Sequence, residues 1–429
     1  MLMKCSLGPL VVGSLLLSGF SFLAPACAAA EPASLSIAAL VEDTLARNPE
    51  LKFYEAEIAA AKGERRGAGA LPNPELTVGG GYKGVRDSAG NILGEGAAWS
   101  VSLAQPIEWP GRLSLRKAIA DKQVSLAELG LAQFRATLRQ RSGALGYAVL
   151  AAQQKSAAAR EIATRFNTLR DVLVQRDPAG VTPQLEASIL EGTALTQQHR
   201  ANEAAVAERL ALASLNQLRG LPPHAPLTLS GELPALSAPR PLADLLAAAR
   251  TNNFDLRARA AELEKQGFKV DLARNERKPA ITVAPYFSHE RADARETQAG
   301  LSLTIPLGFN SAAKSREETE RARLTQAEAS LGTTEREVER KVVEAALQYE
   351  VKRAELARWD GDPAAKFRTN AELADRHYRL GAVPIATYLE AQKTFLEVLE
   401  TVTDTRREAW EAWLELETLT GETAQPKTP

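Results

Sequence analysis

The chain has 429 residues, with 52 basic and 53 acidic side chains and a formal net charge of −1 at pH 7. These charges are spread along the whole chain, which argues against nucleic-acid binding, because that function gathers basic residues into a patch. Both cysteines lie within the first 30 residues, and after residue 31 no apolar run reaches the roughly 18 residues of a transmembrane helix. The sequence therefore excludes a disulfide-stapled scaffold and a helical membrane protein.

The N-terminus, residues 1–30, has the layout of a secretory signal peptide. Lys4 precedes the apolar run 10–23, and small residues occupy 28–30. A single membrane-spanning helix is the alternative, but glycines interrupt the apolar run, which is shorter than the roughly 20 residues that a span needs. A second alternative is lipidation of Cys27, although the residues before it form a poor lipoprotein recognition box. The sequence predicts an exported protein.

Beyond the signal peptide, short motifs recur in the same order at an offset of about 200 residues. The stretch 48–51 aligns with 253–256 at an offset of 205 (253 − 48), the motif at Pro74 aligns at the same offset, and the motifs from Ser102 onward align at 200 or 201. This spacing is far longer than a solenoid period, so the sequence predicts two tandem copies of one large unit. The predicted parts are a first repeat at 31–220, a proline-rich linker at 221–240, a second repeat at 241–421 and a disordered tail at 422–429. The paired motifs begin at Asn48 and Asn253, Pro74 and Pro279, Ser102 and Ser302, Gly180 and Gly381, and Leu215 and Leu416.

Composition within each copy predicts the order helix, strand, strand, long helix, helix. Residues 112–175 contain no proline and are rich in helix formers, which predicts a helix of about 64 residues, or ~96 Å at 1.5 Å per residue. No ordinary globular core holds a helix of that length, and a soluble coiled coil is the alternative that helices alone do not exclude. In the second copy, the sequence around Pro363 is expected to break the corresponding helix. The expected helices include 36–70, 112–175, 183–219, 241–278 and 313–379.

Strands are predicted at 75–84, 99–109, 281–290 and 299–309. In 99–109 the odd positions carry mainly large apolar residues, and the even positions carry mainly small or polar ones. Each run has the roughly 9 to 11 residues that a tilted strand needs to cross a bilayer. A half-buried soluble sheet produces the same alternation, and four strands alone close no barrel, so the membrane interpretation requires several protomers to pool their strands. Aromatic residues at or near the strand ends suit an interfacial girdle: Tyr82, Trp99, Trp109, Phe287 and Phe309.

With its tandem copies, the prolines at its strand ends and its two glycine-containing helical turns, the sequence resembles the TolC-type outer-membrane efflux (outer membrane factor) family. The stretches 71–76 and 105–112 look most like the heavy-metal efflux branch typified by CzcC. The resemblance implies a mainly α fold with a small transmembrane β part: a homotrimer with a twelve-strand β-barrel in outer-membrane lipid and a periplasmic α-helical coiled-coil tunnel. It implies as partners a periplasmic adaptor (membrane fusion) protein and an inner-membrane RND-type pump, which supplies the energy.

The resemblance also gives roles to residues of the two helical turns. Glu390 matches an acidic residue at the channel entrance, where copies around an axis would form a carboxylate ring that attracts cations. Thr387 stands where some members carry a second acid. The turns themselves match the helix tips that contact the adaptor, although glycine and proline are also ordinary helix punctuation. The matching tip residues are Gly180, Val181, Thr182, Gly381, Ala382 and Val383.

Nothing in the sequence indicates an enzyme or a bound cofactor. The mature chain has no Gly-x-Ser-x-Gly or His-Glu-x-x-His motif, no phosphate-binding loop and no cysteine nucleophile. Its four histidines are scattered without ligand spacing, so no metal site is predicted. We therefore expect a passive export duct for heavy-metal cations, located in the outer membrane and extending into the periplasm. A multidrug or type I protein secretion channel and a periplasmic coiled-coil scaffold remain as alternatives.

Overall fold

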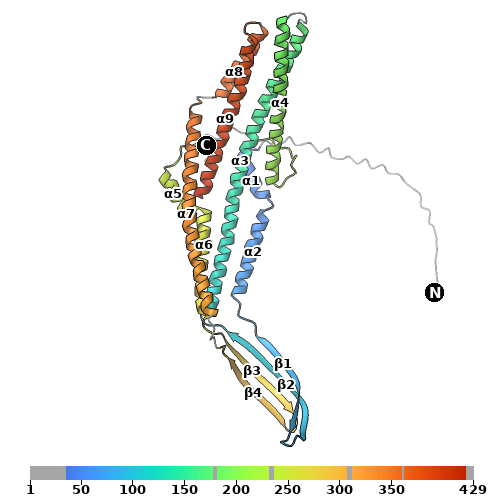
Figure 1. Cartoon of the computed structure of the whole chain (residues 1–429), viewed down its shortest axis with the longest axis vertical. Coiled ribbons are helices and arrows are strands. Elements are labelled where there is room, and N and C mark those ends of the chain that lie inside the picture. The colour runs from blue at the N-terminus through green and yellow to red at the C-terminus, as the bar shows by residue number, and fades with distance from the viewer. Residues whose placement is uncertain (1–34, 177–180, 231–235, 307–311, 360–361, 422–429) are drawn as a thin grey trace, which may run out of the picture.

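The computed structural model describes residues 35–176, 181–230, 236–306, 312–359 and 362–421, with the side chains of 172–185 not described. The predicted signal peptide and C-terminal tail lie outside these residues. Figure 1 shows a long molecule with helices over most of its length and a sheet at one end. Among the residues described, no helix combines the length and the apolar character that crossing a membrane requires.

The described elements follow the same order in both halves of the chain, except that the long helix of the second half is divided into two. This is the mainly α fold with a small β part that the sequence predicts. The elements are α1 (Ile37–Arg47), α2 (Leu51–Ala68), β1 (Glu75–Arg86), β2 (Ile92–Ile107), α3 (Arg112–Arg176), α4 (Val181–Leu218), α5 (Leu242–Asn252), α6 (Phe254–Glu276), β3 (Ile281–Arg291), β4 (Arg295–Thr304), α7 (Ala312–Ala357), α8 (Pro363–Arg379) and α9 (Ile385–Thr420).

The helices predicted as single segments at 36–70 and 241–278 are each two helices, and that part of the prediction is wrong. In the second copy the break falls at Asn253, between α5 and α6. The side-chain oxygen of Asn253 accepts hydrogen bonds from the N–H groups of Asp255 and Leu256, at 3.0 and 3.2 Å. This cap ends one helix and starts the next, because it satisfies N–H groups that have no partner inside α6.

The break between α7 and α8 occurs where the sequence predicts it. Asp362 is the N-cap of α8, and its side chain accepts a hydrogen bond from the N–H of Ala365 at 3.2 Å. Pro363 occupies the first turn, where proline is tolerated because the N–H that it lacks would have no helical partner. The first copy has no such interruption, and α3 is continuous over 65 residues.

Equivalent asparagines of the two copies make equivalent hydrogen bonds. The side-chain amide of Asn48 donates to the carbonyl oxygen of Leu218 at 2.8 Å, and the amide of Asn253 donates to that of Leu419 at 2.9 Å. Each asparagine thus links the break in its split helix to the last turn of α4 or α9. These residues belong to the motifs that recur in the sequence, so the repeated motifs meet in the fold and the two tandem copies are confirmed.

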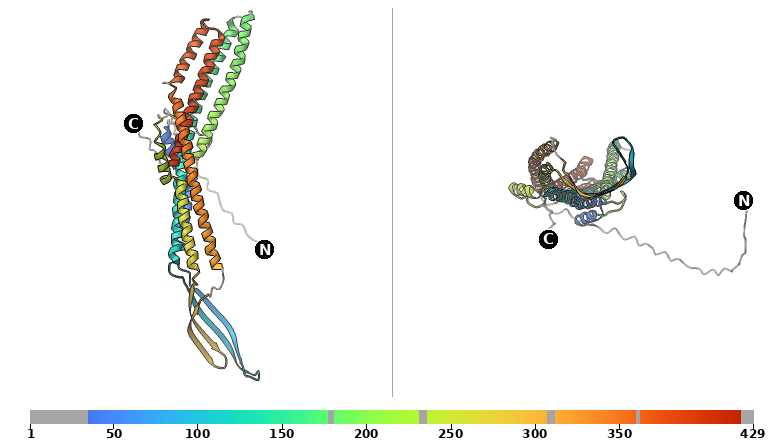
Figure 2. Two further views of the ribbon diagram at one scale, coloured as in Figure 1. Left: turned by 60° about the vertical axis from the view of Figure 1, so that its left-hand side comes forward. Right: turned by 90° about the horizontal axis from the view of Figure 1, so that it is seen from below.

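The helix α3 runs the whole length of the helical part. It packs on α2 toward the sheet and on α4 toward the other end. In the second copy, α7 packs beside α6 and α9, and α8 packs beside α9. Seen from the sheet end, the helices form a curved layer (Figure 2). One cluster of buried side chains lies near the α8–α9 turn and includes Phe166, Tyr388 and Phe395.

The four strands form one antiparallel sheet, in chain order, within the described residues. β2 of the first copy pairs with β3 of the second, so the sheet joins the two copies. β1 and β4 are the edge strands, and neither has a partner on its outer side in this part of the chain. The first hairpin is longer than predicted, because β1 reaches Arg86 and β2 begins at Ile92, in a glycine-rich stretch with little apolar alternation.

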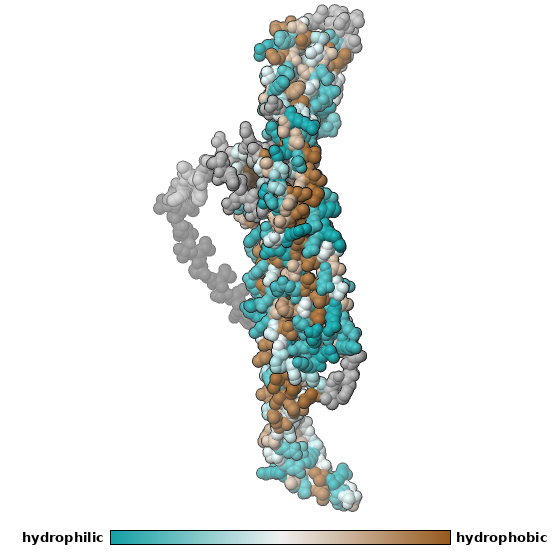
Figure 3. Space-filling view, turned by 90° about the vertical axis from the view of Figure 1, so that its left-hand side faces the viewer, coloured by the Kyte–Doolittle hydropathy of each residue, from teal (hydrophilic) through white to brown (hydrophobic). Residues whose placement is uncertain are grey.

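The two faces of the sheet differ in character. In-register pairing places the even residues of β1 and the odd residues of β2, β3 and β4 on one face. We call this the apolar face and its reverse the polar face, where glycine, serine, threonine and charged residues predominate. Figure 3, viewed from the α7 side, shows hydrophobic residues gathered where the helices meet the sheet. The exposed large residues of the apolar face are Leu76, Val78, Tyr82, Trp99, Leu103, Ile107, Phe287, Leu301 and Leu303.

Candidate functional site

The turn between α8 and α9 lies at the end of the molecule farthest from the sheet (Figure 1). Gly381 has a φ of 72°, and its N–H donates to the carbonyl oxygen of Tyr378 at 2.9 Å. The N–H of Ala382 donates to that of His377, also at 2.9 Å. This pair of bonds is a Schellman motif, which satisfies carbonyl groups at the end of α8 and needs a left-handed residue, so glycine closes the helix. Pro384 then precedes the first residue of α9.

The other predicted tip residues are described in part. Gly180 lies outside the described residues. Val181 and Thr182 begin α4, and only their backbone is described. On the α8–α9 turn, Ala382 is exposed and Val383 is half-buried.

Glu390 lies in the second turn of α9, where its side chain is exposed. In the described part of the chain it takes part in no ion pair. Tyr388, two residues earlier, is fully buried. Because two residues turn an α-helix by about 200°, Glu390 points away from the packed side of α9. Thr387 is exposed as well, so both positions of the predicted entrance are accessible.

Glu390 is the first of a line of charged residues on one face of α9, which the sequence analysis does not single out. Spacings of three, four or seven residues place them on the same face of the helix. The ends of this line, at Glu390 and Glu415, are exposed, whereas Asp404, Glu408 and Glu411 in between are half-buried. In the sequence, the regular spacing of the acidic residues is the signal that indicates this charged face. The line comprises Glu390, Lys393, Glu397, Asp404, Glu408, Glu411 and Glu415.

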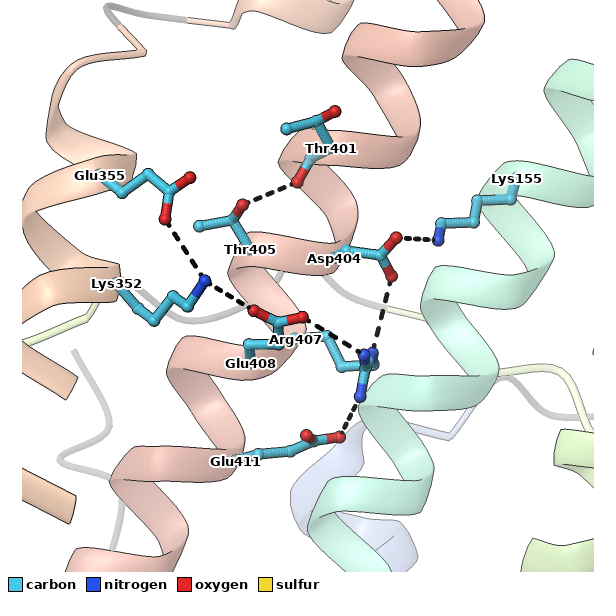
Figure 4. Close-up of polar contacts among 9 residues, drawn as sticks. All are labelled: Lys155, Lys352, Glu355, Thr401, Asp404, Thr405, Arg407, Glu408 and Glu411. Atoms are coloured by element: carbon cyan, nitrogen blue, oxygen red, sulfur yellow. Dashed lines mark hydrogen bonds and ion pairs between the residues drawn. The ribbon is translucent and has the colours of Figure 1, made fainter. Parts of the chain in front are cut away.

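Basic side chains from both neighbouring helices bind this line partway along α9 (Figure 4). Lys155 of α3 binds Asp404 at 2.6 Å, and Lys352 of α7 binds Glu408 at 2.8 Å. Arg407 of α9 lies between the two acids, at 3.8 and 3.9 Å from their oxygens. The hydrogen bond to Glu408 raises the pKa of Lys352, so this lysine is charged at neutral pH. Ion pairs therefore join α9 to α3 and to α7.

Aromatic packing fixes the start of α9. Tyr388 stacks on Tyr378 of α8, with ring centroids 5.2 Å apart, and lies 5.5 Å from the ring of Phe166 of α3. Burial, reinforced by the carboxylate of Asp375, raises the pKa of Tyr388 far above its ordinary value, so its phenol stays neutral. This packing sets the rotation of α9 and with it the direction of Glu390.

The predicted girdle residues lie at two levels of the sheet, and Trp99 is in the middle of β2 and not near a strand end as predicted. Trp99 and Phe287, on neighbouring strands, have ring centroids 5.4 Å apart on the apolar face. Tyr82, on β1, lies on the same face of the sheet, and the side chains of Tyr82, Trp99 and Phe287 are exposed. Trp109 follows the end of β2, at the helix end of the sheet, and a lysine ammonium lies 5.2 Å from its ring. Phe309 lies outside the described residues.

Arg112, the last residue of the motif at 105–112, joins the two copies where the helices meet the sheet. Arg112 is only 7% exposed to solvent. The guanidinium donates to the carbonyl oxygens of Asn275 and Lys278, at 3.2 and 2.9 Å. These carbonyl groups lie at the C-terminal end of α6, where the helix dipole favours a positive charge. The arginine therefore ties the start of α3 to the end of α6.

The described residues contain no group of three His, Cys, Asp or Glu side chains placed to hold a metal ion. His289 lies 3.0 Å from the hydroxyl of Thr297, through Nδ1. His199 lies 3.1 Å from a carboxylate oxygen of Glu203, one turn further along α4. These local contacts account for the imidazoles of His199 and His289.

A long helical body that ends in a sheet with one apolar face defines the class of outer-membrane channel subunits. The family model described as outer membrane efflux protein matches residues 40–221 and 245–422. The chain belongs to this family, and the matched segments cover most of both repeats. It is therefore an outer-membrane efflux channel protein and not an enzyme.

Solved structures of outer-membrane channels share the fold. A crystal structure of CusC matches with a TM-score of 0.72 at 15% sequence identity, over 91% of this chain and 93% of that one. The CmeC outer membrane channel of Campylobacter jejuni matches with a TM-score of 0.73 at 13% identity, over 90% and 85%. The open state of the MtrE outer membrane channel of Neisseria gonorrhoeae matches with a TM-score of 0.69 at 15% identity, over 90% and 89%. No curated protein sequence matches the chain.

Proposed function

We propose that this protein is the outer-membrane duct of a tripartite efflux system, formed by three copies of the chain and carrying heavy-metal cations. The observation that carries the proposal is the open sheet. It has an apolar face, its two edge strands have no outer partner in the part of the chain that the structure describes, and it is continuous with helices long enough to reach far from the membrane. A membrane-embedded sheet must close on itself, because unpaired backbone groups in lipid are costly. Bacterial barrels of this kind usually have at least about 8 strands, so one chain supplies too few.

The helical edges support the same assembly. α4, at one edge of the curved layer, exposes Leu195, Val206 and Leu210, which are 54 to 63% accessible. α7, at the other edge, exposes Leu347 and Val351, at 56 and 61%. Apolar side chains at both edges fit a ring in which the α7 edge of one copy packs on the α4 edge of the next.

The aromatic residues support an orientation of the sheet in lipid. Trp99 and Trp109 are ten residues apart (109 − 99), which is about 33 Å along a strand at 3.3 Å per residue. A strand tilt of roughly 40° reduces this to about 25 Å, the height of the apolar band of outer-membrane barrels. Tyr82, Trp99 and Phe287 then form one girdle and Trp109 belongs to the other.

The far end of the helices supports contact with a periplasmic adaptor, which in turn would engage an inner-membrane RND-type pump. The α8–α9 turn is closed by Gly381 and exposes Leu380, whose side chain is 74% accessible. Glu390, close behind the turn, would face the entrance of the tunnel. Repeated in three copies, it would form a carboxylate ring that favours cations.

Extraction from outer membranes tests the assembly. We expect a trimer by light scattering in detergent and a band on an unheated gel that shifts on boiling. A monomer released from the periplasm without detergent would contradict the proposal.

Growth assays test the cargo. A deletion strain is compared with the same strain carrying the gene, on zinc, cobalt, cadmium or copper and on hydrophobic drugs. The similarity of the stretch 105–112 to the heavy-metal branch leads us to expect sensitivity to one or more of the metals alone. Sensitivity to drugs alone, or loss of a secreted protein, would instead assign the duct to multidrug export or type I secretion.

A further inference from the structure

The polar face of the sheet carries a charged cluster at the end away from the helices. The ammonium of Lys83 on β1 lies 2.6 Å from a carboxylate oxygen of Glu290 on β3 and 2.7 Å from one of Glu296 on β4. Glu290 and Glu296 are direct partners in the β3–β4 pairing. Two like charges placed directly opposite repel each other, and Lys83 lies against both.

Lys83 reaches these acids across β2 because β2 has no side chain at that position. Its partner in the β1–β2 pairing is Gly96. A Cβ at Gly96 would collide with the carbonyl oxygen of Arg291, and one at Gly94 would collide with the backbone of Asp293. The end of the second hairpin therefore lies over the polar face of β2, seated on two glycines.

We propose that Lys83, Glu290 and Glu296 determine the ionic selectivity of the duct at its outward opening. This inference rests on the proposed barrel, in which the polar face lines the channel. Each cluster holds two negative charges and one positive charge, so it leaves one negative charge per chain. Because the end of the second hairpin lies over the polar face of β2, these charges would lie inside the barrel wall, closer to the path of the ions. Rings of fixed charge at such a position select ions by sign.

A simple structural role is the competing explanation, since Lys83 also ties the first hairpin to the second. The two roles differ in what they respond to. The structural role depends on the ion pairs themselves. Ionic selectivity depends on the net charge of the cluster.

The test measures the cation-to-anion permeability ratio of purified full-length channels in planar bilayers, from reversal potentials in potassium chloride gradients. Lys83→Met should raise the ratio, and the double variant Glu290→Gln with Glu296→Gln should lower it. Each change should be at least about twofold at 0.1 M salt, where the Debye length is roughly 10 Å, and should shrink at 1 M, where it is roughly 3 Å. The combination Lys83→Met with Glu296→Gln keeps one negative charge, so it should keep the wild-type ratio although both ion pairs are lost.

A matched control removes an exposed ion pair far from the sheet. Arg250 of α5 binds Glu339 of α7 at 2.7 Å, and Glu339→Gln should leave the ratio unchanged. Conducting channels with a wild-type ratio in both Lys83→Met and the double glutamine variant would overturn the inference while leaving the duct intact. A wild-type protein that does not conduct would overturn the proposed function and this inference with it.

Discussion

Asparagine side chains at two equivalent places hold each repeat together. Asn48 and Asn253 each donate to a carbonyl oxygen in the last turn of a helix about 170 residues later in the chain. Their side-chain oxygens also accept local bonds: that of Asn253 caps α6, and that of Asn48 accepts from the N–H of Glu50, the residue before α2. One asparagine side chain therefore makes a local bond through its oxygen and a long-range bond through its NH₂ group. Alanine has neither group, and an ionised aspartate has only the acceptor.

Replacing Asn253 by Ala should lower stability. The variant removes a cap, worth about 0.5–2 kcal/mol, and leaves the carbonyl of Leu419 without its donor. The measurement is the temperature at which the detergent-solubilised oligomer dissociates on a gel. Asn252→Ala, one residue earlier in the chain, is the control. Equal dissociation temperatures for the two variants would contradict this account.

Replacing Glu390 by Gln should lower the cation preference of the channel in a planar bilayer. The substitution preserves shape and removes one charge per chain at the proposed entrance. Glu339→Gln again serves as the control, since it lies in the α5–α7 ion pair. A permeability ratio that stays at the wild-type value would remove Glu390 from the entrance.

Among the helical elements, the α8–α9 turn and the α6–α7 contact each depend on a few groups. The turn needs a residue with positive φ at Gly381, beyond the end of α8. The contact between α6 and α7 centres on Glu317, which is 4% exposed. Its carboxylate binds Arg321 at 2.7 Å and Arg277 at 3.2 Å. Both elements therefore respond to single changes in ways that can be measured.

Gly381→Val should distort the tip and reduce export, because a β-branched residue in the left-handed region costs about 1–3 kcal/mol. Gly332→Ala is the matched control. Gly332 lies inside α7, where an added Cβ would meet no atom within 4 Å, and alanine should stabilise the helix by about 1 kcal/mol. The readout is metal tolerance of the complemented strain alongside the amount of oligomer in the membrane. Full export by Gly381→Val would show that the turn tolerates this strain.

Acid should weaken the α6–α7 contact. Desolvation raises the pKa of Glu317. Hydrogen bonds from Arg277, Arg274 and Arg321 outweigh this effect and hold the pKa below its ordinary value of 4.5. A depressed carboxyl pKa contributes stability that is present above the unfolded value and is lost as the pH falls through the folded value. Stability should therefore drop as the pH falls below about 4.5.

The measurement is the thermal dissociation temperature between pH 3 and pH 7. Glu317→Gln should lower it at neutral pH and remove part of its dependence on acid. Glu318→Gln changes the exposed neighbouring side chain and should leave the dependence intact. Parallel pH profiles for wild type and Glu317→Gln would rule out this role for Glu317.

At the scale of the whole molecule, the proposed ring would give neighbours to the edges that have no partner among the described residues. Among the described residues the sheet ends at β1 and β4, and the helical layer ends at α2 and α4 on one side and at α7 and α8 on the other. The proposed ring of identical chains would complete both the sheet and the helical layer with one type of contact.

Disulfide cross-linking tests the ring, since the chain has no cysteine after residue 27. Cysteine pairs placed on the two edges, such as Thr77→Cys with Ser302→Cys and neighbouring registers, should form covalent dimers and trimers on oxidation. Ser100→Cys with Ser288→Cys is the control, because these residues are partners within one sheet and should link only within the chain. Edge pairs that yield only monomers in every register would contradict the ring.

The sequence by itself determined the repeat, the unbroken length of α3, the break at Pro363 and the alternation of the strands. These are local properties, because proline, glycine and the spacing of apolar residues act on the backbone within a few residues. The family resemblance followed from the same motifs. It also placed Glu390 and the two helical turns, whose roles remain predictions.

Only the tertiary structure decided which separated residues meet. The bond from Asn253 depends on a partner in the last turn of α9, and the position of Arg112 depends on the end of α6. The Lys83 cluster needs three strands and an intervening glycine to form. Pairing register and helix packing bring these groups together across more than 150 residues of chain. No local pattern encodes such contacts, because they follow from where complete elements pack.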